Sequence, residues 1–234
     1  MDGKMKINTP DRLNRKLTGN YDVAVTHLEN TISDILTVGD QFFYNYTEHG
    51  VPHINKVLEL ADMLIPDETL DALIEKDICL LVMAIIVHDI GMFIHYPGLR
   101  KLLTDEQWRD KWDQYRRELN HMSESEMGRI FGKCGGSNGR SLPKAADIVA
   151  VERNAFELEW QKRLCGEFLR RHHHELAEYI VNNGFPVDIY TDFKPLFTDD
   201  GLSEDEKGLI GLIARSHNES LDRYYKSGLD LIDD

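Results

Sequence analysis

The sequence has few cysteines and no long apolar run, and each scarcity argues against a class of protein. Its three cysteines (Cys79, Cys134 and Cys165) form no C-x-x-C pair, which argues against a disulfide framework or zinc knuckle and favours a reducing compartment. The longest apolar run, 78–87, has ten residues, about half of the ~20 that a membrane span needs, so it predicts a core helix. The first residues contain no apolar signal-peptide core, and we therefore expect a cytoplasmic protein with no membrane partner.

Basic residues are also scarce relative to acidic ones. The chain carries 27 Lys and Arg against 41 Asp and Glu, a formal net charge of −14. Non-specific binding to nucleic acid depends on neutralising many phosphates with basic side chains, so a long duplex is not expected as a partner. A bound cation can dominate the local field, however, and a small phosphorylated ligand, above all a nucleotide, stays compatible with the negative charge.

Strand patterns are nearly absent, and only 187–190 gives a short, weak strand-like signal. Helical periodicity and capping patterns account for most other segments, so an all-α fold is predicted. The expected helices include 21–46, 66–76 and 154–182, and capping boxes at 104–107 and 203–206 open two more. We expect one domain over 1–234, with an N-terminal extension at 1–20 and a helical insertion at 96–153.

Histidine, in contrast, is abundant, with ten residues in the chain. The most informative pair is His88-Asp89, which follows directly on the apolar run 78–87. Buried polar groups need partners, and a carboxylate in an apolar wall needs a positive one. A divalent cation satisfies both side chains, because transition metals accept mixed nitrogen and oxygen ligands.

Helical periodicity selects further histidines. His53 lies in the first turn of an amphipathic helix, and His217 lies near the edge of an apolar stripe formed by Leu209, Leu212 and Ile213. In the helix over 154–182, a rotation of about 100° per residue from Leu169 places His173 nearest the buried stripe and His174 on the flank. The inward-leaning imidazoles and Asp89 predict a site for a divalent transition metal, with Mn, Fe, Ni, Co and Zn all open.

Four segments carry a resemblance to a known family. They are the T-x-H-x-x-x-H motif of 47–53 with the residues that follow it to 57, then 88–92 (His-Asp-Ile-Gly-Met), 170–177 and 216–218 (Ser-His-Asn). Together they resemble the HD superfamily of metal-dependent phosphohydrolases, in order and helical placement, from residue 47 to residue 218. They are most similar to a branch whose members often accompany ATPase or effector domains, so association with such a domain is implied.

The resemblance implies an all-α HD-domain helical bundle and a set of ligands. His53, His88 and Asp89 would hold a first metal, and His173 and His217 would hold a second one that Asp89 bridges to the first. One feature departs from the family pattern, which usually closes the site with an Asp on a further helix. The residues after His217 contain no such motif, so we expect water or substrate to take that position.

The predicted function is metal-dependent hydrolysis of a nucleotide or another phosphorylated small molecule by a metal-activated water. Asp89 and Arg170 are the first candidates for catalytic roles, Arg170 as a cation that stabilises phosphoryl charge, although a surface ion pair explains Arg170 equally well. Lys56 and Arg100 are weaker candidates for this cation. His49 could donate a proton to the leaving group or support a metal ligand through a hydrogen bond.

Two other functions remain open. A degenerate HD domain could bind a nucleotide or a protein without catalysis, and an HD-fold di-iron oxygenase would also use a His-rich carboxylate site. The insertion at 96–153, with Trp108, Trp112 and Tyr115, fits either a lid or specificity element or a solvated helical hairpin. Its segment 132–141 departs from the Walker pattern, which favours a loop, and the oligomeric state is not predicted.

Overall fold

The computed structural model describes residues 5–36, 42, 50–123, 125, 142, 144–150, 159–198 and 201–218. The predicted all-α fold is confirmed: within these ranges the structure has helices, no strand, and one isolated bridge between Phe185 and Lys194. The described helices are α1 (Asp11–Asn14), α2 (Gly19–Leu36), α3 (Val51–Leu64), α4 (Asp67–Ala72), α5 (Glu75–Val87), η1 (Ile90–Phe93), α6 (Tyr96–Leu102), α7 (Glu106–Asn120), α9 (Ala145–Ala150), α10 (Glu159–Asn183) and α11 (Glu204–Ser216).

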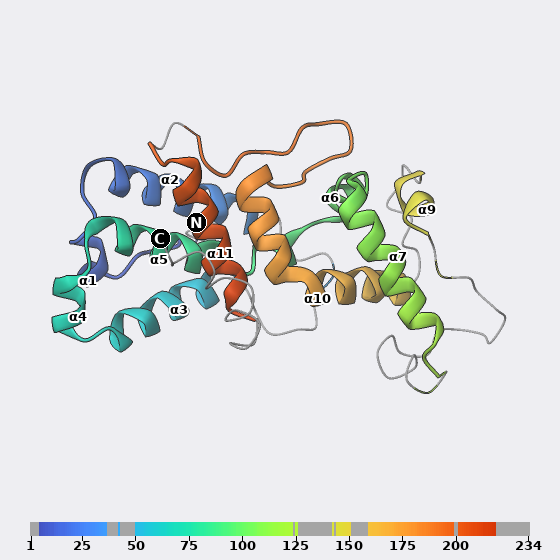
Figure 1. Cartoon of the computed structure of the whole chain (residues 1–234), viewed down its shortest axis with the longest axis horizontal. Helices are drawn as coiled ribbons and strands as arrows, with labels where there is room; N and C mark the ends of the chain where they lie inside the picture. The colour runs from blue at the N-terminus through green and yellow to red at the C-terminus, as the bar shows by residue number, and fades with distance from the viewer. Residues whose placement is uncertain are drawn as a thin grey trace, which may run out of the picture.

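Helix α5 is the centre of the bundle, and α2, α3 and α11 pack around it (Figure 1). Its uninterrupted apolar sequence explains this position, because a helix that is apolar on all sides is stable only when it is surrounded. The run ends at Val87; His88 is the C-cap of α5, and Asp89 is the N-cap of the short helix η1. His88 and Asp89 are therefore held at the end of α5, among the helices that pack around it.

No helix in the described ranges is both long and apolar enough to cross a membrane by itself. The pair Glu75–Phe93 and Tyr96–Leu102 meets the criteria of length and composition only when both are counted together, and it is bent by 98°.

Two expected helices differ from the observed ones. The helix expected over 21–46 is α2, which ends at Leu36, and Phe42 lies in a bend. The helix expected over 66–76 is interrupted, since Leu73 and Ile74 have extended backbones between α4 and α5. The break has a local cause: the side chain of Asp77 accepts a hydrogen bond from the amide of Ile74 at 3.1 Å and so caps a new helix.

The insertion packs on the first half of α10 through aromatic side chains. Trp112 and Tyr115 of α7 contact Phe168 of α10, with ring centroids 4.9 and 5.6 Å apart, and the Tyr115 hydroxyl donates to the carbonyl of Leu164 at 3.2 Å. All three rings are buried. This packed aromatic face distinguishes the insertion from a hairpin that is solvated on all sides. Figure 1 shows α10 running from α7 at one end to the bundle around α5 at the other. A role as a lid stays a prediction.

The capping box predicted at 203–206 is confirmed, and it opens α11. The Ser203 hydroxyl accepts from the amide of Glu206 at 3.2 Å, and the Ser203 amide donates to Glu206 at 2.8 Å. The carboxylate of Glu206 also accepts from the Tyr21 hydroxyl of α2 at 2.9 Å and lies 3.4 Å from Lys76 of α5. One carboxylate thus ties three helices together. The box predicted at 104–107 is shifted, because Asp105 is the N-cap and accepts from the amide of Gln107.

Replacing Glu206 with Gln should destabilise the fold by about 1 kcal/mol near neutral pH, because the charged acceptor is lost. Hydrogen bonds from Ser203, Tyr21 and Lys76 lower the pKa of Glu206 to about 2, below the value of about 4.3 expected in the unfolded chain. A lowered pKa in the folded state gives stability that is complete above the unfolded pKa and is lost as the pH falls toward 2. The difference in unfolding free energy between wild type and Glu206→Gln, measured in urea, should therefore shrink as the pH falls from about 7 to about 3. A difference that stays constant would contradict this role.

Candidate metal centre

Five predicted site residues meet at one place, although four helices and a turn supply them. His53 is in the first turn of α3, His88 caps α5, Asp89 precedes η1, His173 is in α10, and His217 caps α11. Asp89 is buried, with 8% of its side chain exposed, and the four imidazoles around it are between 12% and 30% exposed. The cluster therefore lies at the edge of the core.

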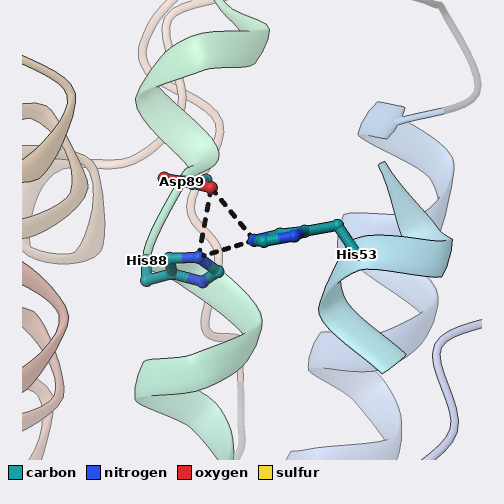
Figure 2. A group of neighbouring side chains, drawn as sticks. All are labelled: His53, His88 and Asp89. Carbon is teal, nitrogen blue, oxygen red and sulfur yellow. Dashed lines mark hydrogen bonds and ion pairs between the residues drawn. The ribbon is translucent and has the colours of Figure 1, made fainter. Parts of the chain in front are cut away.

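The first group consists of His53, His88 and Asp89 (Figure 2). The Nε2 atoms of the two histidines are 3.3 Å apart. Oxygen Oδ2 of Asp89 lies 3.5 Å from Nε2 of His53 and 3.1 Å from Nε2 of His88. Figure 2 shows the His53 ring pointing from α3 toward the end of α5.

The second group consists of Asp89, His173 and His217. The Nε2 atoms of the two histidines are 2.8 Å apart, and each lies 3.6 Å from oxygen Oδ1 of Asp89. The rings of His88 and His217 meet edge to face with centroids 5.1 Å apart, so the two groups are adjacent. Asp89 therefore directs one carboxylate oxygen toward each group.

These distances fit metal coordination. Ligand atoms bound at about 2.0–2.2 Å to one transition metal ion are about 2.8–3.6 Å from each other in octahedral or tetrahedral arrangements. The observed separations within each group fall in this range, and imidazole nitrogen with carboxylate oxygen is a donor set that such metals accept. Each group could hold a metal ion, with Asp89 shared between them.

Backbone carbonyls orient the imidazoles of His88, His173 and His217. Nδ1 of His88 donates to the carbonyl of Ile85 at 2.7 Å, and Nδ1 of His173 donates to the carbonyl of Arg170 at 2.6 Å. Nδ1 of His217 bonds to the carbonyl of Ala214 in the same way. In each case the acceptor is three residues earlier in the chain. A proton on Nδ1 leaves the lone pair of Nε2 directed at the cluster, which is the tautomer that binds a metal.

The charge of Asp89 affects these imidazoles unequally. Burial disfavours protonation of His88, but the hydrogen bond and charge of the adjacent Asp89 outweigh burial and raise its pKa. The pKa of His217 is lowered by burial, and the neighbouring rings of His88 and His173 act in the same direction. A divalent ion would compete with a proton for Nε2 of His88, so metal binding should weaken as the pH falls.

The proposed cations have other partners in the structure. Arg170 makes two bonds of 2.8 Å to the carboxylate of Glu167 through Nε and a terminal nitrogen, while its carbonyl holds His173. Lys56 is exposed and lies 3.1 Å from Glu59. Arg100 is buried and donates to the carbonyl of Val149, which is a structural contact. His49 lies outside the described residues, as do the carboxylates after residue 218 and the segment 132–141.

The helical wheel misplaced His174, which it put on the flank of α10. His174 is buried, with 9% of the residue exposed, and it lines a cavity with Lys111 and Tyr115 of α7. The reason is that the insertion covers this side of α10, so the helix is buried on two sides. His172, next to it, bonds to Glu175 at 3.0 Å, and Glu175 also accepts from Lys111 at 2.7 Å.

The apolar stripe assigned to α11 was also wrong. Leu209, Leu212 and Ile213 are 37–42% exposed, whereas the buried face consists of Glu206, Ile210, Gly211 and Ala214. His217 continues that buried face, which explains how it reaches the cluster. The small residues Gly211 and Ala214 were the sequence signal for this face. A Cβ atom on Gly211 would lie 3.3 Å from the Cα of Glu178 in α10, so the two helices are in close contact there.

A comparison with models of protein families gives a match. Residues 43–231 match the model of a protein family described as HD-CE, and this range includes all five residues of the cluster. No curated protein and no solved structure matches the chain.

Replacing Asp89 with Ala should weaken metal binding more than any single histidine replacement, because Asp89 belongs to both groups and is their only anionic member. The loss of affinity should exceed the roughly 10- to 100-fold typical of removing a hydrogen bond that supports a ligand. Elemental analysis and titration with Mn²⁺ or Zn²⁺ would measure the bound equivalents. His121→Ala is the control, since His121 is exposed at the end of α7. Wild-type protein that binds no metal under these conditions would contradict the assignment.

Proposed function

The chain belongs to the HD-CE family, and we propose that it is a metal-dependent phosphohydrolase that acts on a nucleotide or another small phosphorylated molecule. The observation that carries the proposal is the division of the Asp89 carboxylate between two groups. Oδ2 faces His53 and His88, and Oδ1 faces His173 and His217. If each group held a divalent ion, the pair would suit displacement at phosphorus, where charge develops on both the attacking and the leaving oxygen.

A bound divalent ion lowers the pKa of a coordinated water, so that hydroxide is available near neutral pH. The chain's own residues fix the geometry of that event. The carbonyls of Ile85, Arg170 and Ala214 hold three imidazoles in the metal-binding tautomer, and the buried position of Asp89 keeps its carboxylate from rotating into solvent. Little reorganisation is then needed when the substrate arrives.

Arg170 is proposed to stabilise the phosphoryl oxygens during the reaction. Its backbone already supports His173, and its side chain is 46% exposed while it is bonded to Glu167. The pairing holds the guanidinium against Glu167, in the turn of α10 before His173, without burying it. When water attacks phosphorus, the bond to the leaving oxygen breaks, and that oxygen needs a proton. His49 remains the candidate for the proton donor.

The direct test is a screen of nucleoside mono-, di- and triphosphates and cyclic nucleotides for phosphate release in the presence of Mn²⁺, Fe²⁺, Ni²⁺, Co²⁺ or Zn²⁺. Activity should require metal and should be abolished by His88→Ala or Asp89→Ala, because both residues belong to the first group. His121→Ala should leave the rate unchanged. Equal rates in the wild type and both site variants would show that the activity arises from a contaminant. Metal binding with oxygen-dependent turnover and no phosphate release would favour the oxygenase instead.

Arg170→Ala should lower the turnover of the reactive nucleotide by about 100-fold, the scale expected when one charge-stabilising donor is removed, while the bound metal is retained. Arg171→Ala is the matched control. Arg171 pairs with the same Glu167 at 3.0 Å, but it stacks on Tyr115 and lies near Glu118, both in α7. Equal losses of activity in the two variants, or loss of metal from Arg170→Ala alone, would assign Arg170 a structural role.

A further inference from the structure

We infer that Gly91 is a positioning residue: the absence of a side chain lets α10 lie close enough to η1 for Asp89 to reach His173 and complete the second group. This inference rests on the metal-dependent function proposed above. It assigns a role to a residue that cannot bind a metal through a side chain.

Gly91 is not required by its backbone conformation. Among the described glycines, only Gly19, Gly184 and Gly201 have a positive φ angle, the region that disfavours other residues. Gly91 is buried in η1, two residues after Asp89, and η1 is tied to that residue by a hydrogen bond from the amide of Met92 to the carbonyl of Asp89 at 2.9 Å. The reason for a glycine at this position must therefore be space.

The space is taken up by α10. A Cβ atom on Gly91 would lie 2.6 Å from Cβ of Leu176, 3.0 Å from the carbonyl oxygen of His173 and 3.2 Å from Cα of His173. These atoms belong to the backbone or are attached directly to it, so no change of rotamer can move them away. An added methyl group would have to displace this turn of α10 as a unit.

The size of the displacement decides the consequence. Carbon atoms pack at about 3.5–4.0 Å, so the contact with Leu176 requires a shift of about 1 Å between α10 and η1. Metal–ligand distances tolerate deviations of only about 0.2 Å. A shift several times larger would separate His173 from Asp89, whereas none of the three atoms that the added Cβ would meet belongs to α3, α5 or the residues His53 and His88.

The experiment is a Co²⁺ titration of the metal-free wild type, Gly91→Ala and Gly98→Ala, with binding followed by calorimetry and by the visible absorption of Co²⁺. Gly98 is the matched control because a side chain there would collide with the carbonyl oxygen of Pro186, which follows α10 and is not part of the cluster. Both variants should unfold at a lower urea concentration than the wild type, because overpacking destabilises a close-packed interior.

The wild type and Gly98→Ala should each bind two ions. Gly91→Ala should bind the first ion normally and the second at least about tenfold more weakly, with a changed absorption spectrum for the second ion. A wild type that binds no Co²⁺ would overturn the proposed function. A wild type with two ions and a Gly91→Ala variant with two equally tight ions would overturn only the role of Gly91. Weakening of both ions, or equal weakening in Gly98→Ala, would also overturn it.

A second variant decides the matter if Gly91→Ala does not fold. Leu176→Ile conserves volume, so it should be tolerated, but it adds a methyl branch on the carbon that faces Gly91. The second ion should again bind more weakly than in the wild type, and the first should be unaffected. Unchanged binding of both ions would overturn the inference.

Discussion

The structure depends on a carboxylate that is buried at the end of an apolar helix. Asp89 follows the core helix α5, and its side chain is 8% exposed. An isolated buried carboxylate is strongly unfavourable, so the surrounding elements must supply positive or hydrogen-bonding partners. Helices α3, α5, α10 and α11 each bring one imidazole to it. The packing of these four helices therefore also determines the positions of the candidate metal ligands.

Helix α10 connects the candidate site to the insertion. Its first half packs against the aromatic side chains of α7, its middle carries His173, and its second half packs against α11. The insertion contacts Phe168 and His172 on the same helix that carries a proposed metal ligand. It is therefore connected to the site through α10, even though it contributes none of the five clustered residues.

The sequence allowed the prediction of the core helix, the residues that cluster and the all-α fold, because a long apolar run and repeated histidines are strong local patterns. The spacing of apolar residues along one helix does not show which of its faces other helices cover. For this reason His174 was placed on the flank and the exposed residues Leu209, Leu212 and Ile213 were placed in the core. The division of Asp89 between two groups came from the family resemblance, whereas its geometry and the carbonyls that orient the imidazoles depend on the folded chain.

The composition of the cluster also explains how an acidic protein could attract an anionic substrate. Imidazoles that bind metal are neutral, so the charge of the proposed centre comes only from the ions and from Asp89. Two divalent ions with one carboxylate would leave a net charge of about three positive units at a partly exposed site. The formal charge of −14 is spread over the whole chain, and at physiological salt charges more than about 8 Å away are largely screened. A small phosphorylated molecule would then experience an attractive field close to the site, whereas a long duplex would also meet the acidic surface around it.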